Sequence, residues 1–81
     1  SGLNTDVSSL ETEELYRLIH EAILALPEKC RHIFVLSRQE SLTNQEIAQK
    51  LNLSVKTVEG QITIALKKIR KFLGDQYSYL W

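Results

Sequence analysis

The sequence predicts an all-α protein, a small bundle of about four helices that ends in a helix-turn-helix without a β-wing. Apolar residues recur at spacings of three and four along most of the chain, and no segment shows the alternation of apolar and polar residues typical of a strand. Several serine and threonine residues stand where helix N-caps are expected. The 81 residues are enough for one small domain with a modest core. We place that domain at residues 10–74, after a terminal remnant and linker end at residues 1–9 and before a tail at residues 75–81.

The first two helices are expected to meet at a proline. Ser8 and Glu11 have the spacing of a capping box, so the first helix is expected over about residues 10–25. Helical spacing continues through the apolar residues Leu15, Leu18, Ile19, Ala22, Ile23 and Leu26. The second helix is expected to hold Pro27 in its first turn and to end near Arg38. Its inner side would carry Cys30, Ile33, Phe34 and Ser37.

The third helix is expected to be short and to be followed by a tight turn. After a polar linker at residues 39–42, Thr43 and Glu46 form a second capping box. The inner stripe of the helix would consist of Ile47, Ala48 and Leu51. Asn52 suits the left-handed conformation that often ends a helix, and Ser54 can cap the next one. A three-residue turn between two such helices is typical of a helix-turn-helix.

The fourth helix is expected to be the longest and to end at Gly74. Its inner stripe repeats at spacings of three and four through Val55, Val58, Ile62, Ala65, Leu66, Ile69 and Leu73. Among these, Val58, Ile62 and Ile69 are expected to be buried. At about 100° per residue, the side opposite Val58 carries Lys56, Glu59, Gly60, Thr63, Ile64, Lys67, Arg70 and Lys71.

Two residues on this opposite side allow more than one interpretation. Glycine weakens a helix interior, so Gly60 either permits close approach of another molecule or is an unselected surface position. Ile64 is apolar among polar neighbours. It either contacts a thymine methyl group or is an ordinary exposed isoleucine.

Charge is distributed unevenly although the chain has no net charge. Residues 1–26 hold five acidic side chains and one basic side chain, whereas residues 54–81 hold five basic and two acidic ones. A one-sided basic patch of this type attracts phosphate backbones, although a solvated helix face is the other interpretation.

Four motifs follow one another within Ala25 to Leu73, namely LPEKCRHIF, EIA, SVKTVE and ALKKIR. In this order and spacing they resemble region 4, the C-terminal promoter-reading domain of extracytoplasmic-function (ECF) sigma factors, small sigma-70 relatives of bacterial RNA polymerase. The SVKTVE form is similar to variants abundant in Bacteroides-type bacteria. The resemblance implies a cytoplasmic domain whose fourth helix reads the −35 promoter element.

The resemblance also implies site residues and partners. The implied DNA-binding residues are Lys56, Thr57, Glu59, Gly60, Gln61, Thr63, Ile64 and Lys67, with Thr43 and Asn44 contacting phosphate at the start of the third helix. Of these, Glu59, Gly60, Thr63 and Ile64 would face the bases. The implied partners are promoter DNA, the flap of the polymerase β subunit and an anti-sigma factor. A region 2 that reads the −10 element would precede residue 1.

Two other binding functions remain open from the sequence. The output domain of LuxR-type response regulators has a very similar helix-turn-helix, but LPEKCRHIFVL lacks the usual opening of that family. A protein-interaction module would use apolar surface and the tail residues Tyr77, Tyr79, Leu80 and Trp81. The other interpretations of this tail are that it folds back over the first two helices or that it is a mobile end.

An enzyme is not expected. His20, Cys30 and His32 are the only soft metal ligands, and the latter two point to different sides of a helix. We expect Cys30 in the core and both histidines at the surface. No glycine-rich phosphate loop or serine elbow is present in the sequence, so we expect no catalytic residue, cofactor or metal.

Overall fold

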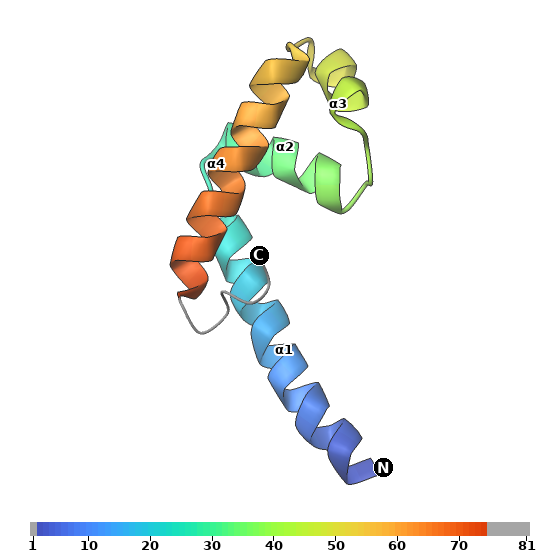
Figure 1. The fold of residues 1–81 in the computed structure, drawn as a ribbon, viewed down its shortest axis with the longest axis vertical. Coiled ribbons are helices and arrows are strands. Elements are labelled where there is room, and N and C mark those ends of the chain that lie inside the picture. The colour runs from blue at the N-terminus through green and yellow to red at the C-terminus, as the bar shows by residue number, and fades with distance from the viewer. Residues whose placement is uncertain (1, 75–81) are drawn as a thin grey trace.

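The computed structural model describes the backbone of residues 2–74 and the side chains of residues 12–74. This part of the chain contains four helices and no strand, which confirms the predicted all-α class (Figure 1). The helices are α1 (Gly2–Leu24), α2 (Glu28–Arg38), α3 (Asn44–Leu51) and α4 (Val55–Leu73). The tail residues Tyr77, Tyr79, Leu80 and Trp81 lie outside the described residues. None of the described helices is both long and apolar enough to cross a membrane.

Helix α1 begins well before the predicted start. It runs from Gly2 and has 23 residues, so it is longer than the 19-residue α4. The predicted N-cap at Ser8 is therefore wrong, because the backbone is already helical there. No proline or glycine between Leu3 and Leu24 interrupts the helix, and a capping residue inside a helix does not by itself start one. The N-terminal half of α1 projects beyond the other helices (Figure 1).

Helix α2 starts one residue later than predicted. Pro27 is its N-cap, with φ −55° and ψ 149°, instead of a residue of the first turn. The extended ψ directs the chain around the corner from α1 before the helix begins. Burial of Cys30, Ile33 and Phe34 is confirmed, Leu36 is buried as well, and Ser37 is half-buried.

The caps at the ends of α3 and α4 are those predicted from the sequence. Thr43 Oγ1 accepts a hydrogen bond from the Glu46 N–H at 3.1 Å, and the Thr43 N–H donates to Glu46 Oε1 at 2.8 Å, which completes the predicted capping box. Asn52 adopts the left-handed conformation, with φ 57° and ψ 48°. Ser54 Oγ accepts a hydrogen bond from the Thr57 N–H at 3.0 Å, and α4 ends before Gly74 with φ +81°.

Helix α4 packs against each of the other three helices and links two apolar clusters. One cluster joins α1, α2 and the C-terminal half of α4 through Ala22, Leu26, Cys30, Phe34, Ala65, Ile69 and Leu73. The other joins α2, α3 and the N-terminal half of α4 through Ile33, Leu36, Ile47, Ala48 and Val58. The predicted burial of Val58 and Ile69 is confirmed, whereas Ile62 is only partly buried and Val55 is exposed. Val55 is the first residue of α4 and lies where the bundle ends.

Candidate nucleic-acid interface

The helix-turn-helix holds α4 in a fixed position relative to α3. Three residues, 52–54, connect the two helices. The Leu53 N–H donates a hydrogen bond to the Ala48 carbonyl at 2.9 Å, so the turn is tied back to α3. Ala48 and Val58 are buried between the helices, where a small residue on α3 allows close packing. This packing turns the opposite side of α4 toward solvent.

We define the outer face of α4 by its exposed residues opposite Val58. They are Lys56, Glu59, Gly60, Thr63, Ile64, Lys67, Arg70 and Lys71. The structure therefore brings the four predicted base-facing residues onto one exposed face. Gln61, which was also predicted to bind DNA, is only half-exposed and lies toward the α2 side, where its carbonyl accepts a hydrogen bond from Cys30.

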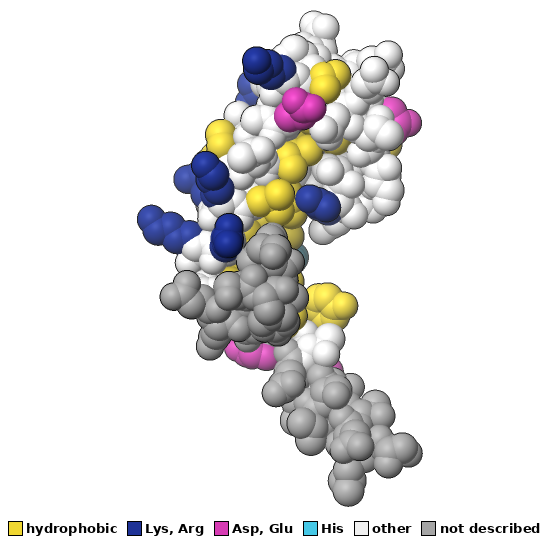
Figure 2. Space-filling view, viewed as in Figure 1, with side chains coloured by type: hydrophobic (Ala, Val, Ile, Leu, Met, Phe, Trp, Pro, Cys, Tyr) yellow, Lys and Arg dark blue, Asp and Glu magenta, His cyan; other side chains and the backbone are white. Residues whose placement is uncertain are grey.

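The outer face and its margin are positively charged. Exposed Lys56, Lys67, Lys68, Arg70 and Lys71 all belong to α4, against the single acidic residue Glu59. Figure 2 shows the blue side chains gathered along the edge formed by this helix. Within the described side chains, ion pairs form only on α1, where Arg17 contacts Glu14 and Glu21 at 2.6 Å each. The α4 cations are therefore available to an external anion.

The predicted phosphate-binding residues lie at two helix N-termini. Thr43 caps α3, and Asn44 is its half-buried first residue. Thr57 is exposed in the first turn of α4, where its Oγ1 accepts a hydrogen bond from Ser54 Oγ at 2.9 Å. The Thr57 hydroxyl proton thus remains free to be donated outward. Backbone N–H groups at helix starts favour anions, which is consistent with phosphate contacts at both positions.

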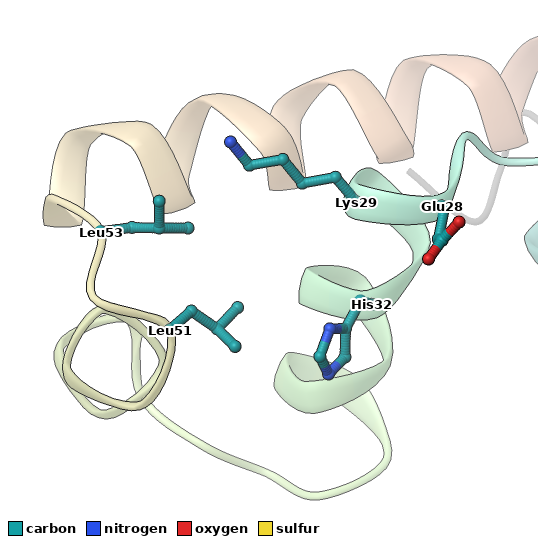
Figure 3. A pocket seen from close by; sticks show the side chains of 5 residues that line it. All are labelled: Glu28, Lys29, His32, Leu51 and Leu53. Atoms are coloured by element: carbon teal, nitrogen blue, oxygen red, sulfur yellow. The ribbon is translucent and has the colours of Figure 1, made fainter.

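A groove on another side of the domain was not predicted from the sequence. It has a volume of about 470 Å³ and is lined by Glu28, Lys29, His32, Leu51 and Leu53. Figure 3 shows Leu51 and Leu53 extending from the segment around the turn toward the part of α2 that carries Lys29 and His32. Leu51 and Leu53 remain partly exposed because α2 diverges from the turn. The only sequence signal was this pair of leucines on either side of Asn52.

The soft metal ligands are dispersed, as their spacing predicts. His20 and His32 are exposed, whereas Cys30 is buried. The Cys30 thiol donates a hydrogen bond to the Gln61 carbonyl at 3.4 Å. Burial raises the pKa of this thiol, and the positive charge of Lys68 opposes the shift only in part. No group of three metal-ligating side chains occurs among the described residues.

Fold and outer face together define a helix-turn-helix domain of the DNA-binding class. The sigma-70 region 4 family matches residues 16–69, which is more than half of the chain. The chain therefore belongs to the sigma-70 region 4 family. It is also similar to the ECF RNA polymerase sigma factor SigW of Bacillus subtilis (strain 168), with 39% identity over 62 residues. That match covers 76% of this chain but only 33% of the relative, so the chain spans about a third of the relative's length.

No solved structure gives a significant match to the chain. The family match confirms the prediction of a sigma region 4, and none of these comparisons supports the LuxR alternative.

Proposed function

We propose that this chain is the −35-reading domain of an ECF sigma factor and that α4 enters the major groove of promoter DNA. The observation that carries this proposal is the outer face of α4. It is exposed and cationic, it has no ion-pair partner within the described side chains, and it is held outward by buried contacts to α3. A helix presented in this way is how helix-turn-helix proteins read DNA.

The length of α4 allows it to perform two tasks. Its 19 residues span about 28 Å, which is longer than the part of a helix that fits into the major groove of DNA. Glu59, Gly60, Thr63 and Ile64 in the N-terminal half would therefore face base edges. Lys67, with Lys56 at the other end of this segment, would contact phosphates on either side.

A second surface would bind protein. The groove between α2 and the turn shares no residue with the outer face, so both can be occupied at once. Its leucines and mixed charges suit the apolar and polar side chains of a protein partner. We assign this role to the flap of the polymerase β subunit, with an anti-sigma factor as a competitor. Attachment to polymerase also explains how a chain without net charge binds DNA, because the assembly supplies affinity that phosphate contacts alone do not.

The promoter sequence that is read should differ from that of relatives with a more basic face. Glu59, Gln61 and Ile64 are not basic, and the SVKTVE segment retains the form similar to Bacteroides-type variants. A domain of this kind acts where the chromosome is transcribed, in the bacterial cytoplasm.

Paired charge reversals test the two surfaces against each other. Lys67→Glu should weaken binding to duplex DNA about eightfold or more at 0.1 M salt, because one phosphate contact contributes about this factor. It should leave binding to the purified β flap unchanged. Lys29→Glu makes the same change in net charge at the groove. It should leave DNA binding nearly unchanged and weaken flap binding. Equal DNA binding by wild type and Lys67→Glu, measured by fluorescence anisotropy, would contradict the proposed docking of α4.

A further inference from the structure

Gly60 has no structural explanation within the domain. It lies in the middle of α4, where glycine costs up to about 1 kcal/mol relative to alanine. Its φ is not in the left-handed region, and a Cβ built on it would meet nothing within 4 Å. Neither backbone conformation nor packing therefore requires glycine here. The missing side chain matters only to something that approaches the outer face.

Ile64 lies one helical turn after Gly60 on the same face. It is 42% exposed and belongs to neither apolar cluster. Residues at i and i+4 are neighbours on a helix surface, about 6 Å apart along the axis. The missing side chain of Gly60 leaves open space on the outer face, which we call the recess, and the apolar Ile64 side chain lies one helical turn further along the same face.

The surroundings of this recess indicate the chemistry of its occupant. Lys56 precedes Gly60 by about one turn, and Lys67 follows Ile64 by about one turn, both exposed. Figure 2 shows small apolar areas between the basic side chains along this edge. An occupant should therefore present a small apolar group within a strongly anionic surface. In the major groove, the only such group on an unmodified base pair is the 5-methyl group of thymine.

We propose that Gly60 and Ile64 form a notch that receives the 5-methyl group of one thymine in the target DNA. The inference rests on the proposed docking of α4 in the major groove, and it adds the identity of a base. The glycine lets the helix backbone come close to the base pair, and the isoleucine removes the methyl group from water. The notch thus specifies a T·A pair at one position without a hydrogen bond.

Replacing thymine by uracil tests the notch, because this change removes only the methyl group. Randomised duplexes are selected with the 81-residue chain at 50 mM salt, and each thymine of the selected duplex is then replaced singly by deoxyuridine. One position should lose about fourfold in affinity, which corresponds to burial of one methyl group. In Ile64→Ala the ratio of thymine to uracil affinity at that position should fall below about twofold.

Two further variants separate the notch from general effects. Gly60→Ala fills the recess, so it should lower affinity for the selected duplex while raising the melting temperature of the free domain by a few degrees. Leu24→Ala removes an apolar side chain of α1 that is more exposed than Ile64, and it should leave the thymine to uracil ratio unchanged.

The possible outcomes distinguish the notch from the proposed function. Equal affinity for thymine and uracil at every position, or retention of DNA without any enriched base, would overturn the notch while leaving DNA binding intact. Failure of the chain to retain any duplex at 50 mM salt would overturn the proposed function and the notch together.

Discussion

At the scale of single residues, we propose that Glu59 sets the base preference at one position of the target DNA. An ionised glutamate only accepts hydrogen bonds, and the donor that cytosine presents in the major groove is its N4 amino group. Glu59 is exposed on the outer face, and it makes no hydrogen bond or ion pair with another described side chain. It also lies beyond the first turn of α4, where a stabilising effect of the helix dipole has largely faded.

We expect Glu59→Gln to relax discrimination at one base pair by about 1–3 kcal/mol without changing the fold. The measurement is selection of a randomised −35 element by the complete sigma factor with polymerase, for wild type, Glu59→Gln and Glu59→Arg. The preferred base should change at a single position. Three identical sequence preferences would show that Glu59 does not contact a base, and circular dichroism of each variant controls for folding.

Burial of the Cys30 thiol is expected to make the stability of the domain depend on pH. Its thiol has an ordinary pKa of about 9.0, and burial raises the pKa in the folded domain. Below the ordinary pKa the thiol is protonated in both the folded and the unfolded chain, so it contributes fully to the free energy of unfolding. Above that pH the unfolded chain loses the proton while the folded domain retains it, so stability decreases as pH rises.

The comparison that isolates this contribution uses Cys30→Ala. Lysine and tyrosine side chains also titrate in the alkaline range, and their effects are common to both proteins. The difference in free energy of unfolding between wild type and Cys30→Ala, measured with urea, should shrink between about pH 8 and pH 10.5. A difference that stays constant over this range would show that the thiol pKa is not raised by folding.

At the scale of helices, the backbone of the connection between α2 and α3 is strained, so a substitution there can stabilise the domain. Ser41 has a φ of 55°, in the left-handed region that a serine rarely adopts. The Leu42 N–H donates to the Leu36 carbonyl at 3.1 Å, so this conformation closes the end of α2. Ser41→Gly should therefore stabilise the domain by about 0.5–1 kcal/mol.

Asn52 provides the matched comparison for Ser41. It adopts nearly the same conformation, with φ 57°, but asparagine tolerates it much better than serine. Asn52→Gly should therefore change the free energy of unfolding less than Ser41→Gly does. Chemical denaturation of the two variants beside wild type gives both values, and a larger gain at Asn52 would contradict this account of the strain.

The helix ends also show what the sequence reveals and what it does not. The caps at Thr43 and Ser54 were predictable because both partners of each capping hydrogen bond lie within three residues. The start of α1 was not, because Ser8 and Glu11 match a capping box equally well inside a continuing helix. Ser41 was also missed, since its conformation follows from how α2 and α3 are placed and not from the residue itself.

The same distinction applies to the candidate site. The outer face of α4 follows from helical periodicity alone, so Glu59, Gly60 and Ile64 were placed correctly from the sequence. The groove depends on the angle between α2 and the turn, which no local pattern encodes. Gln61 lies three residues after Val58, about 60° from it around the helix, so periodicity already places it toward the inner side, and only the family resemblance added it to the predicted DNA-binding residues.

At the scale of the whole molecule, the acidic and the basic parts of the charge distribution lie on different helices. Acidic Glu13, Glu14 and Glu21 lie on α1, whereas the described basic side chains of the C-terminal third lie on α4. Within the described side chains, Glu14 and Glu21 pair with Arg17 of the same helix, and no acidic residue of α1 pairs with α4. Although the chain has no net charge, it therefore has a basic face that a phosphate backbone can meet without displacing a partner among the described side chains.

This separation predicts a shallow but measurable salt dependence of DNA binding. In the proposed complex about three to five cations of the outer face meet DNA phosphates, and each neutralised phosphate contributes roughly −0.9 to the slope of log K against log salt concentration. Lys67→Ala removes one cation from the outer face and should weaken binding to all sequences alike while flattening the slope by about 1. Lys29→Ala removes a lysine that lines the groove instead, so its slope should equal that of wild type.

The measurement is fluorescence anisotropy of a labelled duplex between 50 and 300 mM salt, a range chosen because exposed charges are not yet fully screened. A Lys67→Ala slope equal to that of wild type would place Lys67 outside the interface, and a flattened slope for Lys29→Ala would mean that DNA contacts the groove as well.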